Sequence, residues 1–313
     1  MIAGIVAAVV AGALWGLVFI APHYTASFTA LELTVVRYGF FGVASVGVLL
    51  GCGLDSAKRL SRRDWFRFFL YGLTGYAAYY TLCATAIQRI GTAFTALIIG
   101  SLPLVMAVIG NLLTPAIRFK RLAPPLVMVG AGLVLIHVEA LSAGTSVASD
   151  PSGAWMGIIA AFGAVAAWTY YGLSNAAQIV RQPATLSSAV WTALIGVGTL
   201  AALVPVSVGA VAIGGWPAMR PRAEVLNFLA WAAAMGIVCS WGATYLWNIA
   251  SRRLPTPLLA QLIVFETLFA LGYGYWREDR APTALEGASA LLILWGVVWG
   301  VRVFTRRAPA PAA

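Results

Sequence analysis

Long apolar stretches fill most of the chain, with short polar connections between them. A membrane-spanning helix needs roughly 20 apolar residues. Ten stretches come close to that length: 2–21, 31–51, 65–87, 92–113, 123–138, 153–177, 184–206, 225–247, 258–276 and 284–302. Backbone groups in hydrocarbon must form hydrogen bonds within their own segment, and these stretches are too long and too evenly apolar for barrel strands. The pattern therefore predicts an all-α integral membrane protein with ten transmembrane helices.

The composition agrees with this prediction, because 61% of the 313 residues are hydrophobic and only 10% are charged. The mean hydropathy of +0.88 is far above that of a soluble globular domain. Met1 leads almost directly into the first apolar stretch, so we expect a retained helix rather than a cleaved signal peptide. Cys52, Cys83 and Cys239 lie in or at the edge of apolar stretches without metal-ligand spacing, so neither a disulfide, a metal nor a cofactor is expected.

The positions of the 20 Lys and Arg residues predict the orientation of the protein. Basic residues in short loops are retained on the cytoplasmic side of a membrane. Most of them share the side of the N-terminus, in the segments 58–67, 118–121, 252–253 and 302–307 and at Arg181. Both termini are therefore predicted to be cytoplasmic. Because these bases are scattered over separate short loops, the net charge of +10 gives little support for nucleic-acid binding.

A connection without Lys or Arg, at residues 139–150, divides the ten predicted helices into two sets of five. Since each set has an odd number of helices, the two sets must have opposite orientations. Two pairs of segments are also similar in sequence: 13–16 with 166–169, and 86–93 with 250–257. We therefore predict three parts: a five-helix repeat at 1–145, an inverted five-helix repeat at 146–305 and a cytoplasmic tail at 306–313. Inverted repeats are typical of secondary transporters, whose site lies near the middle of the membrane.

The junction between the third and fourth predicted helices has the sequence Ala-Ile-Gln-Arg-Ile-Gly-Thr-Ala-Phe-Thr-Ala-Leu-Ile-Ile-Gly-Ser-Leu-Pro-Leu-Val at residues 86–105. Together with the five-plus-five arrangement, it resembles the EamA-type branch of the drug/metabolite transporter superfamily over essentially the whole chain. In that family the fourth helix commonly carries a Leu-x-Pro-like element, and the matching helix of the second repeat carries Glu-Pro. This chain has Ser101-Leu102-Pro103 and Phe265-Glu266-Thr267, so the second proline is absent.

The aromatic content and the opening element Ala-Leu-Trp-Gly-Leu-Val-Phe at residues 13–19 are most similar to bacterial aromatic amino acid exporters. The resemblance implies a central cavity surrounded by the first, third, fourth, sixth, eighth and ninth helices. It also implies amino acid export across the bacterial inner membrane, with a small-molecule substrate and the lipid bilayer as the partners.

Two predicted helices carry aromatic and amide side chains on one face. Trp241, Tyr245 and Asn248 follow each other at i, i+4 and i+7 in the eighth helix. The sixth helix has a similar face with Trp168, Tyr171, Asn175 and Gln178. Such faces suit a zwitterion with a planar apolar group, because rings pack on rings and amides bond the polar end. The alternative is that the rings form interfacial belts and the amides link neighbouring helices.

Trp15 of the first helix and the tyrosines of the third helix are further candidates for substrate binding. Tyr76 can share one helix face with Tyr80 or with Tyr79, but an ordinary α-helix does not place all three on one face. We therefore take Trp15, Tyr76 and Tyr80 as the substrate-binding candidates of these two helices.

Glu266 is the only carboxylate well inside an apolar stretch. A charged acid at the bilayer centre costs roughly 2.5–3.5 kcal/mol on insertion scales, so it must be protonated, paired or in contact with water. Three roles stay open: a proton carrier, an anchor for a substrate ammonium, or a structural hydrogen-bond donor. Arg37 lies inside the second helix, five residues after Glu32. It is expected either to be paired or snorkelling, or to bind a substrate carboxylate near the outer mouth.

Pro103 removes a backbone hydrogen bond in the predicted fourth helix, and Gly100 precedes it by three residues. The sequence therefore predicts a kink at Gly100 and Pro103 that acts as a hinge. His23 and His137 fall at outer helix ends, where a lone histidine is usually structural.

No cluster such as His-x-x-x-His or Gly-x-Ser-x-Gly suggests an enzyme, and no Walker A sequence suggests ATP-driven transport. A channel needs a continuous polar path or charged rings, whereas the inner candidates are rings and amides with one acid. The sequence therefore predicts a secondary, alternating-access exporter of amino acids, aromatic and other neutral ones. An exporter of cationic or lipophilic drugs or metabolites is the first alternative, ahead of an intramembrane enzyme or a structural membrane subunit.

Overall fold

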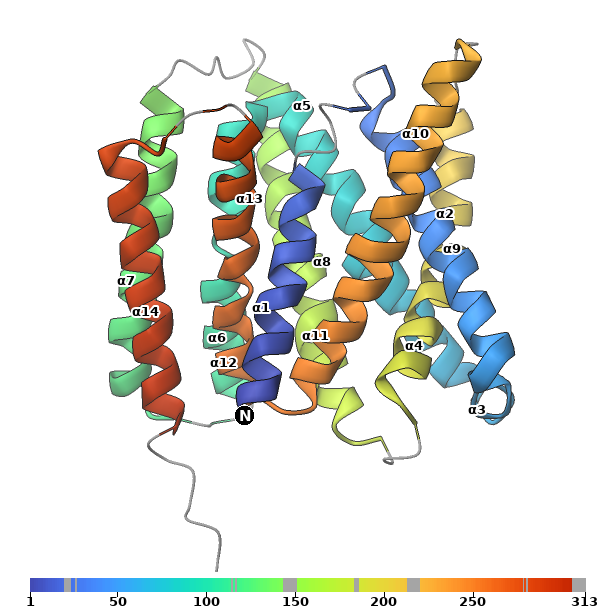
Figure 1. Cartoon of the computed structure of the whole chain (residues 1–313), viewed down its shortest axis with the longest axis horizontal. Coiled ribbons are helices and arrows are strands. Elements are labelled where there is room, and N and C mark those ends of the chain that lie inside the picture. The colour runs from blue at the N-terminus through green and yellow to red at the C-terminus, as the bar shows by residue number, and fades with distance from the viewer. Residues whose placement is uncertain are drawn as a thin grey trace, which may run out of the picture.

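The computed structural model describes residues 1–19, 24–25, 27–113, 115, 117–142, 151–182, 186–212, 220–277, 279 and 281–305. Within these ranges the chain forms helices and short connections, and no strand. The helices run side by side between two ends of the molecule, and some of them are strongly tilted (Figure 1). The all-α class expected from the apolar stretches is therefore confirmed.

The first half of the chain begins with α1 (Ile2–Gly16), which a short 3-10 turn, η1 (Leu17–Phe19), extends. The second rod consists of α2 (Ala30–Val48), the π-helical segment η3 (Leu49–Gly53) and α3 (Leu54–Lys58). The third consists of α4 (Arg62–Gly72), the π-helical segment η4 (Leu73–Ala77) and α5 (Ala78–Ile99). This half ends with α6 (Leu102–Leu113) and α7 (Phe119–Ser142).

The second half begins with two long helices, α8 (Pro151–Ile179) and α9 (Ser188–Ala212). The next rod consists of α10 (Arg222–Ala234), the π-helical segment η5 (Met235–Gly242) and α11 (Ala243–Ser251). The chain continues with α12 (Thr256–Leu262), α13 (Val264–Arg277) and α14 (Ala284–Thr305).

Six helical runs in the described part of the chain are long and apolar enough to cross a membrane by length and composition. They are Leu31–Lys58, Gly153–Ile179, Ser188–Val208, Arg222–Ser251, Thr256–Arg277 and Ala284–Phe304. Two shorter helices, Ile2–Gly16 and Leu102–Leu113, are also apolar. The protein is therefore a multi-pass helical membrane protein, whereas the number of ten spans stays a prediction.

One predicted helix boundary is wrong. The connection expected between residues 87 and 92 lies inside α5, which continues to Ile99, and the interruption falls at Gly100 and Ser101. The polar residues at the expected boundary are ordinary helix formers, so they do not end a helix. Glycine weakens a helix, and the Ser101 hydroxyl donates to the Ile98 carbonyl at 2.6 Å, which competes with regular backbone bonding.

Capping boxes begin two of the helices. The Thr29 hydroxyl accepts the Glu32 N–H at 3.2 Å at the start of α2, and the Glu32 carboxylate accepts the Thr29 N–H at 2.6 Å. Ser61 and Asp64 form the same pair of bonds at the start of α4, at 3.1 and 3.2 Å. Each box satisfies N–H groups that a helix start leaves free. Hydrogen bonds from Ser61, together with the neighbouring Arg67 charge, hold the pKa of Asp64 below its ordinary value.

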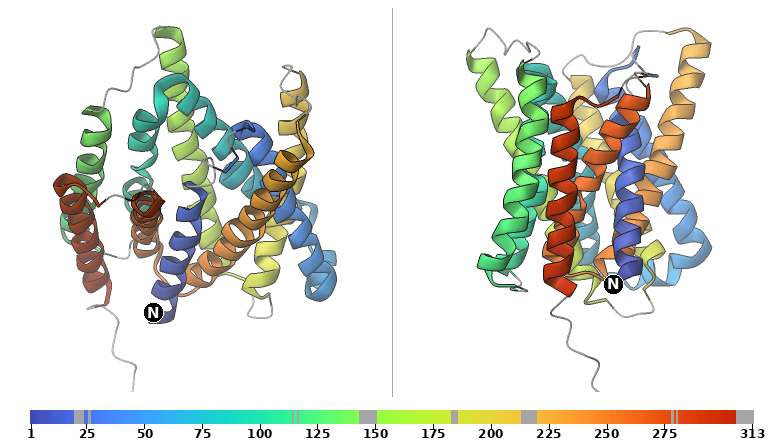
Figure 2. Two further views of the ribbon diagram at one scale, coloured as in Figure 1. Left: turned by 45° about the horizontal axis from the view of Figure 1, so that its top comes forward. Right: turned by 60° about the vertical axis from the view of Figure 1, so that its left-hand side comes forward.

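The helices pack in a few dominant pairs: α7 with α14, α9 with both α2 and α4, α6 with α12, α5 with α8, and α1 with both α11 and α13 (Figure 2). The contact of α1 with α13 is close because Gly12 and Gly16 have no side chain. A Cβ atom on Gly12 would lie 3.0 Å from the backbone nitrogen of Glu266, and one on Gly16 would lie 2.9 Å from that of Ala270. Small residues four apart are typical of close helix contacts in membranes. This contact fixes α1 against the helix that carries Glu266.

The N-terminus and the end of α14 lie at the same end of the bundle (Figures 1 and 2). The junction of α3 with α4, the start of α7 and the connection from α11 to α12 lie there too. The exposed bases of these segments are Lys58, Arg59, Arg62, Arg63, Arg118, Lys120, Arg121 and Arg253. At the opposite end, the guanidinium of Arg220 donates to both carboxylate oxygens of Glu32, at 2.6 and 3.2 Å.

Candidate functional site

Two rods of the bundle are interrupted within their apolar length. Between α5 and α6, Gly100 and Ser101 form a turn in which the Ser101 N–H donates to the Ile98 carbonyl at 3.1 Å. Between α12 and α13, the Ile263 N–H donates to the Ala260 carbonyl at 3.3 Å. In membrane proteins, non-helical backbone at membrane depth is tolerated where it is buried in protein or lines a cavity. These interruptions therefore mark the region in which a site is expected.

Pro103 differs from the expectation of a kinked helix. It is the second residue of α6, where the helix has already been interrupted and a missing N–H costs no backbone bond. The expected kink is therefore a break between two helices, and its role as a hinge stays a prediction.

Three tryptophans from different helices form one group of rings. The ring centroids of Trp15 and Trp168 are 6.2 Å apart, so the structure brings two of the sequence-predicted residues together. Trp247, which the sequence analysis missed, lies 5.3 Å from Trp15 and 6.2 Å from Trp168. Its indole N–H is buried and has no hydrogen-bond partner among the described residues. No periodicity in the sequence distinguishes Trp247 from an ordinary buried ring.

The tyrosines of η4 and α5 belong to the same aromatic region. The Tyr76 hydroxyl forms hydrogen bonds with the hydroxyl of Tyr171 at 3.0 Å and with that of Thr244 at 2.7 Å. The ring of Tyr38, another residue that the sequence analysis missed, lies 5.5 Å from Tyr76 and 6.4 Å from Tyr80.

Tyr79 joins this region through Trp168, with ring centroids 6.5 Å apart. All three tyrosines of the third rod therefore reach one set of rings. The physical reason is the π-helical turn of η4, which contains Tyr76 and shifts the helix face by a fraction of a turn. An ordinary α-helical spacing, on which the sequence analysis relied, does not include this shift.

The two amides are placed in a separate cluster, which we call the amide cluster (Asn175, Trp191, Thr192 and Asn248). Asn175 Nδ2 donates to Asn248 Oδ1 at 2.8 Å, and Trp191 Nε1 donates to Asn175 Oδ1 at 2.7 Å. Asn248 Nδ2 donates to the Thr192 hydroxyl at 2.8 Å. Both amides are completely buried. In this conformation they link α8, α9 and α11, as the alternative interpretation of the sequence expected.

Trp241 and Tyr245 lie on a more accessible part of the same rod. Their rings are stacked, with centroids 5.5 Å apart and planes at 17°, and both side chains are half-buried. The indole N–H of Trp241 is buried without a hydrogen-bond partner among the described residues. Because Trp241 belongs to η5, the i, i+4, i+7 pattern does not keep it on the same face as Asn248.

Arg37 and Glu266 form what we call the charge site. Arg37 is 6% exposed, its Nε donates to the Ser240 hydroxyl at 2.9 Å, and its guanidinium lies 5.0 Å from the centre of the Tyr38 ring. Glu266 is half-buried in the first turn of α13 and interacts electrostatically with Arg37 without a direct ion pair. Glu32 is not the partner of Arg37, because it pairs with Arg220.

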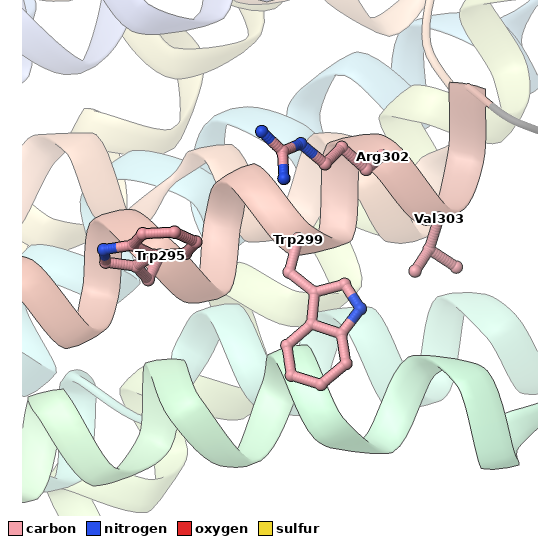
Figure 3. A pocket seen from close by; sticks show the side chains of 4 residues that line it. All are labelled: Trp295, Trp299, Arg302 and Val303. Carbon is pink, nitrogen blue, oxygen red and sulfur yellow. The ribbon is translucent and has the colours of Figure 1, made fainter.

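The structure has two pockets of note, and neither is lined by residues of the aromatic region or the charge site. One, of about 260 Å³, is formed by Trp295, Trp299, Arg302 and Val303, all of which extend from α14 (Figure 3). The other, of about 370 Å³, lies beside the ends of α8 and α11 and includes Arg181. Among the described residues no group of three or more His, Cys, Asp or Glu is placed to hold a metal ion. His23 and the side chain of His137 lie outside the described residues.

A multi-pass helical bundle with interrupted spans and central aromatic and charged side chains defines a membrane transporter of small molecules. Residues 2–137 match the model of the EamA-like transporter family. The inner membrane protein YtfF of Escherichia coli (strain K12) is 32% identical, and the match covers 96% of this chain and 96% of that protein. The chain belongs to the EamA-like transporter family of the drug/metabolite transporter superfamily, and it is a multi-pass protein of the bacterial inner membrane.

A protein of known crystal structure shares the fold. The match has a TM-score of 0.77 at 20% identity and covers 97% of this chain and 98% of that protein. At this identity the likeness carries information on the fold alone. The family membership expected from residues 86–105 is confirmed by the relative and the family model together.

Proposed function

We propose that the protein is a secondary transporter that exports amino acids, aromatic and other neutral ones, by alternating access. The observation that carries this proposal is the occurrence of the same irregularities at corresponding places of the two halves. The similarity of 86–93 to 250–257 relates the halves by an offset of 164 residues, from Ala86 to Ala250. With this offset Gly100 corresponds to Val264, next to the second interruption at Ile263.

The π-helical segments follow the same correspondence. The offset relates the residues of η4 to residues 237–241, which lie within η5. The helix pairs agree as well: α5 packs on α8 as α11 packs on α1, while α2 with α9 and α7 with α14 each pair a helix with its counterpart. These relations support two inverted five-helix repeats at 1–145 and 146–305. The proposed tail at 306–313 lies outside the described residues.

An inverted repeat gives a physical basis for alternating access, because exchanging the conformations of the two halves produces a second state that opens to the other side. The exposed bases at the end that holds the N-terminus and the end of α14 support a cytoplasmic location of that end. The amide cluster lies near this end, since Asn175 and Asn248 are close to the ends of α8 and α11. We therefore propose that the amide cluster closes the cytoplasmic side and separates when substrate enters.

The substrate is proposed to bind among the half-buried and buried side chains of the central region. These residues are Trp15, Tyr76, Tyr80, Trp168, Tyr171, Trp241, Tyr245 and Glu266. Rings of this kind suit a planar apolar side chain. Asn175 and Asn248 become available to substrate only when the amide cluster separates. The outward direction of transport and the choice of aromatic amino acids follow from the resemblance to bacterial exporters.

The test is transport by the purified protein in proteoliposomes. Vesicles are loaded with labelled phenylalanine, tryptophan, lysine or a quaternary amine, and efflux is followed with and without an imposed pH gradient. We expect phenylalanine and tryptophan to be transported faster than lysine, and the quaternary amine to be retained. Retention of both aromatic amino acids in vesicles that contain folded protein would refute the proposed function.

An exporter of cationic or lipophilic compounds is the second candidate function. It is favoured by Glu266, whose carboxylate makes no hydrogen bond or ion pair with any described residue and lies near the aromatic region. The same experiment distinguishes the two functions. Transport of the quaternary amine without transport of amino acids, lost in Glu266→Gln, would support the second candidate. If Glu266→Gln leaves flux and its response to the pH gradient unchanged, Glu266 is not a proton carrier.

A further inference from the structure

The side chain of Arg37 has unused hydrogen-bonding capacity. Its Nε is fixed by the Ser240 hydroxyl, whereas its two terminal nitrogens form no hydrogen bond with a described residue. The side chain as a whole is buried, with 6% of its surface exposed, and its guanidinium lies 5.0 Å from the centre of the Tyr38 ring. A guanidinium held by one edge presents its other edge as two parallel N–H donors, which match a carboxylate.

Glu266 also has unused hydrogen-bonding capacity, as an acceptor. Its carboxylate makes no hydrogen bond or ion pair with any described residue, and the side chain is half-buried. Arg37 is near enough to act on it electrostatically, yet the two groups do not touch. Separated and unpaired charges within a membrane protein are costly. A ligand that carries both charges would satisfy each group at once.

The surroundings of the charge site are uncharged at neutral pH. Tyr38 of α2 interacts with both Arg37 and Glu266, and Tyr79 and Cys83 of α5 interact with Glu266. Tyr80 of α5 and Cys239 of η5 interact with Arg37. These hydroxyls, thiols and rings carry no full charge, so the charges of Arg37 and Glu266 dominate the recognition of a ligand.

We propose that Arg37 and Glu266 bind the two ends of one zwitterionic substrate: the guanidinium binds the α-carboxylate and Glu266 binds the α-ammonium. This inference rests on the proposed function and narrows it to ligands with both groups free. A monoamine leaves Arg37 unpaired and is repelled by it. A monocarboxylate leaves Glu266 unpaired and is repelled by it. Arg37 and Glu266 are then specificity-determining residues, and the aromatic region contacts the side chain of the substrate.

The first test uses the wild-type protein in proteoliposomes and four compounds that share one ring. Phenylalanine, phenylalaninamide, phenethylamine and 3-phenylpropionate compete with labelled phenylalanine for transport. We expect each analogue to compete about 10- to 100-fold more weakly than phenylalanine, because each lacks one charge-assisted interaction. Phenethylamine or 3-phenylpropionate that competes as well as phenylalanine would overturn the proposal.

The second test crosses variants with these compounds. Arg37→Gln should weaken the apparent affinity for phenylalanine about 10- to 100-fold and leave that for phenethylamine unchanged or improved. Glu266→Gln should weaken the affinity for phenylalanine and spare 3-phenylpropionate. Arg37→Lys keeps the charge without the paired donors, so its effect should be intermediate. A purely structural role would weaken all four compounds equally, and that result would also overturn the proposal.

Two control variants test whether the loss of a charge elsewhere in the protein changes the competition. Arg302→Gln and Glu224→Gln remove the same charges from exposed positions of α14 and α10, and they should leave competition unchanged. If a variant of Arg37 or Glu266 fails to fold, the competition experiment with the wild-type protein tests the proposal without it. If phenylalanine is transported and the analogues compete as strongly as phenylalanine does, only the charge-site proposal is overturned. No transport of any amino acid by the folded wild-type protein would overturn both proposals.

Discussion

The amide cluster and the charge site are two polar regions of one bundle, and they differ in how completely their hydrogen bonds are satisfied. Asn175 and Asn248 are completely buried and bonded to each other and to two residues of α9. Arg37 and Glu266 keep donor and acceptor atoms that no described residue engages. Burial alone therefore does not distinguish the two regions. The proposal for the charge site rests on its unsatisfied hydrogen-bonding capacity, because native proteins rarely leave buried polar groups without partners.

The largest expected effect is the loss of stability when the amide cluster is broken. Asn175→Ala leaves Trp191 Nε1 without its acceptor and Asn248 Oδ1 without its donor, both in a buried region. We expect the free energy of unfolding to fall by about 2–3 kcal/mol. The change is measured by unfolding of the purified protein in detergent, followed by tryptophan fluorescence.

Arg37→Gln is the counterpart of this variant at the charge site. It removes one hydrogen bond and a charge that has no partner, so the free energy of unfolding should fall by less than about 1 kcal/mol. A loss of stability in Arg37→Gln as large as in Asn175→Ala would erase the distinction between the two regions.

The second effect concerns η5 and α11, the rod that contributes to both regions. Ser240 holds Arg37, Asn248 belongs to the amide cluster, and the stacked rings of Trp241 and Tyr245 lie between them along the chain. Trp241→Ala or Tyr245→Ala should raise the apparent KM for phenylalanine about fivefold, since stacking on a ring contributes about 1 kcal/mol.

The control for these two variants is Tyr170→Ala, which removes an exposed ring from α8. It should leave the apparent KM unchanged. If Trp241→Ala and Tyr245→Ala also leave the affinity for aromatic substrates intact, the substrate does not contact this part of the rod.

The third effect is smaller and lies at the end where α4 begins. Asp64 is partly exposed, and its carboxylate has hydrogen-bond partners: it accepts hydrogen bonds from Ser61 and pairs with Arg67 at 3.0 Å. Asp64→Ala should lower the free energy of unfolding by about 1 kcal/mol at neutral pH, as expected for a lost helix cap.

The loss of stability in Asp64→Ala should become smaller as the pH falls. The pKa of Asp64 is below its ordinary value of 3.8, mainly because of the bonds from Ser61. The stabilisation is therefore complete above pH 3.8 and disappears as the pH falls through the pKa of the folded protein. Asp55→Ala, which removes an exposed acid of α3, is the control. A difference between wild type and Asp64→Ala that grows on acidification would contradict the capping role.

The fold was predictable from the sequence to the extent that the membrane dictates it. Hydrocarbon forces apolar stretches into helices, so the all-α class and most helix positions follow from composition and length. The boundary inside α5 was missed because a few polar residues look like a connection, whereas the interruption depends on Gly100 and Ser101. The π-helical segments have no recognisable sequence signal, and they decide which faces Tyr79 and Trp241 occupy.

The sequence predicted which types of residue form the candidate site, but only some of the contacts between them. Trp15 and Trp168 were expected at one site, and they meet. The bond between Asn175 and Asn248 joins residues far apart in the sequence, and no local pattern chooses between bonding a ligand and bonding each other. The electrostatic interaction between Glu266 and Arg37 was likewise missed, because Glu32 is nearer in the sequence and suggested a local partner. Tertiary packing decides these choices.

The smallest expected effect concerns the interruption between α5 and α6. The corresponding interruption between α12 and α13 occurs without a proline, since the offset relates Pro103 to Thr267. Pro103 is the second residue of α6 and replaces no backbone bond. Pro103→Ala should therefore change the free energy of unfolding by less than about 0.5 kcal/mol and the transport rate by less than about threefold.

Pro205→Ala is the matched proline variant, because Pro205 lies inside α9, where alanine restores a backbone N–H. It should stabilise the protein more than Pro103→Ala does. Initial rates of phenylalanine efflux and unfolding in detergent are measured for both variants. If Pro103→Ala abolishes transport without loss of stability, the proline itself is the hinge. The two interruptions then differ in mechanism, because the break at Ile263 must move without one.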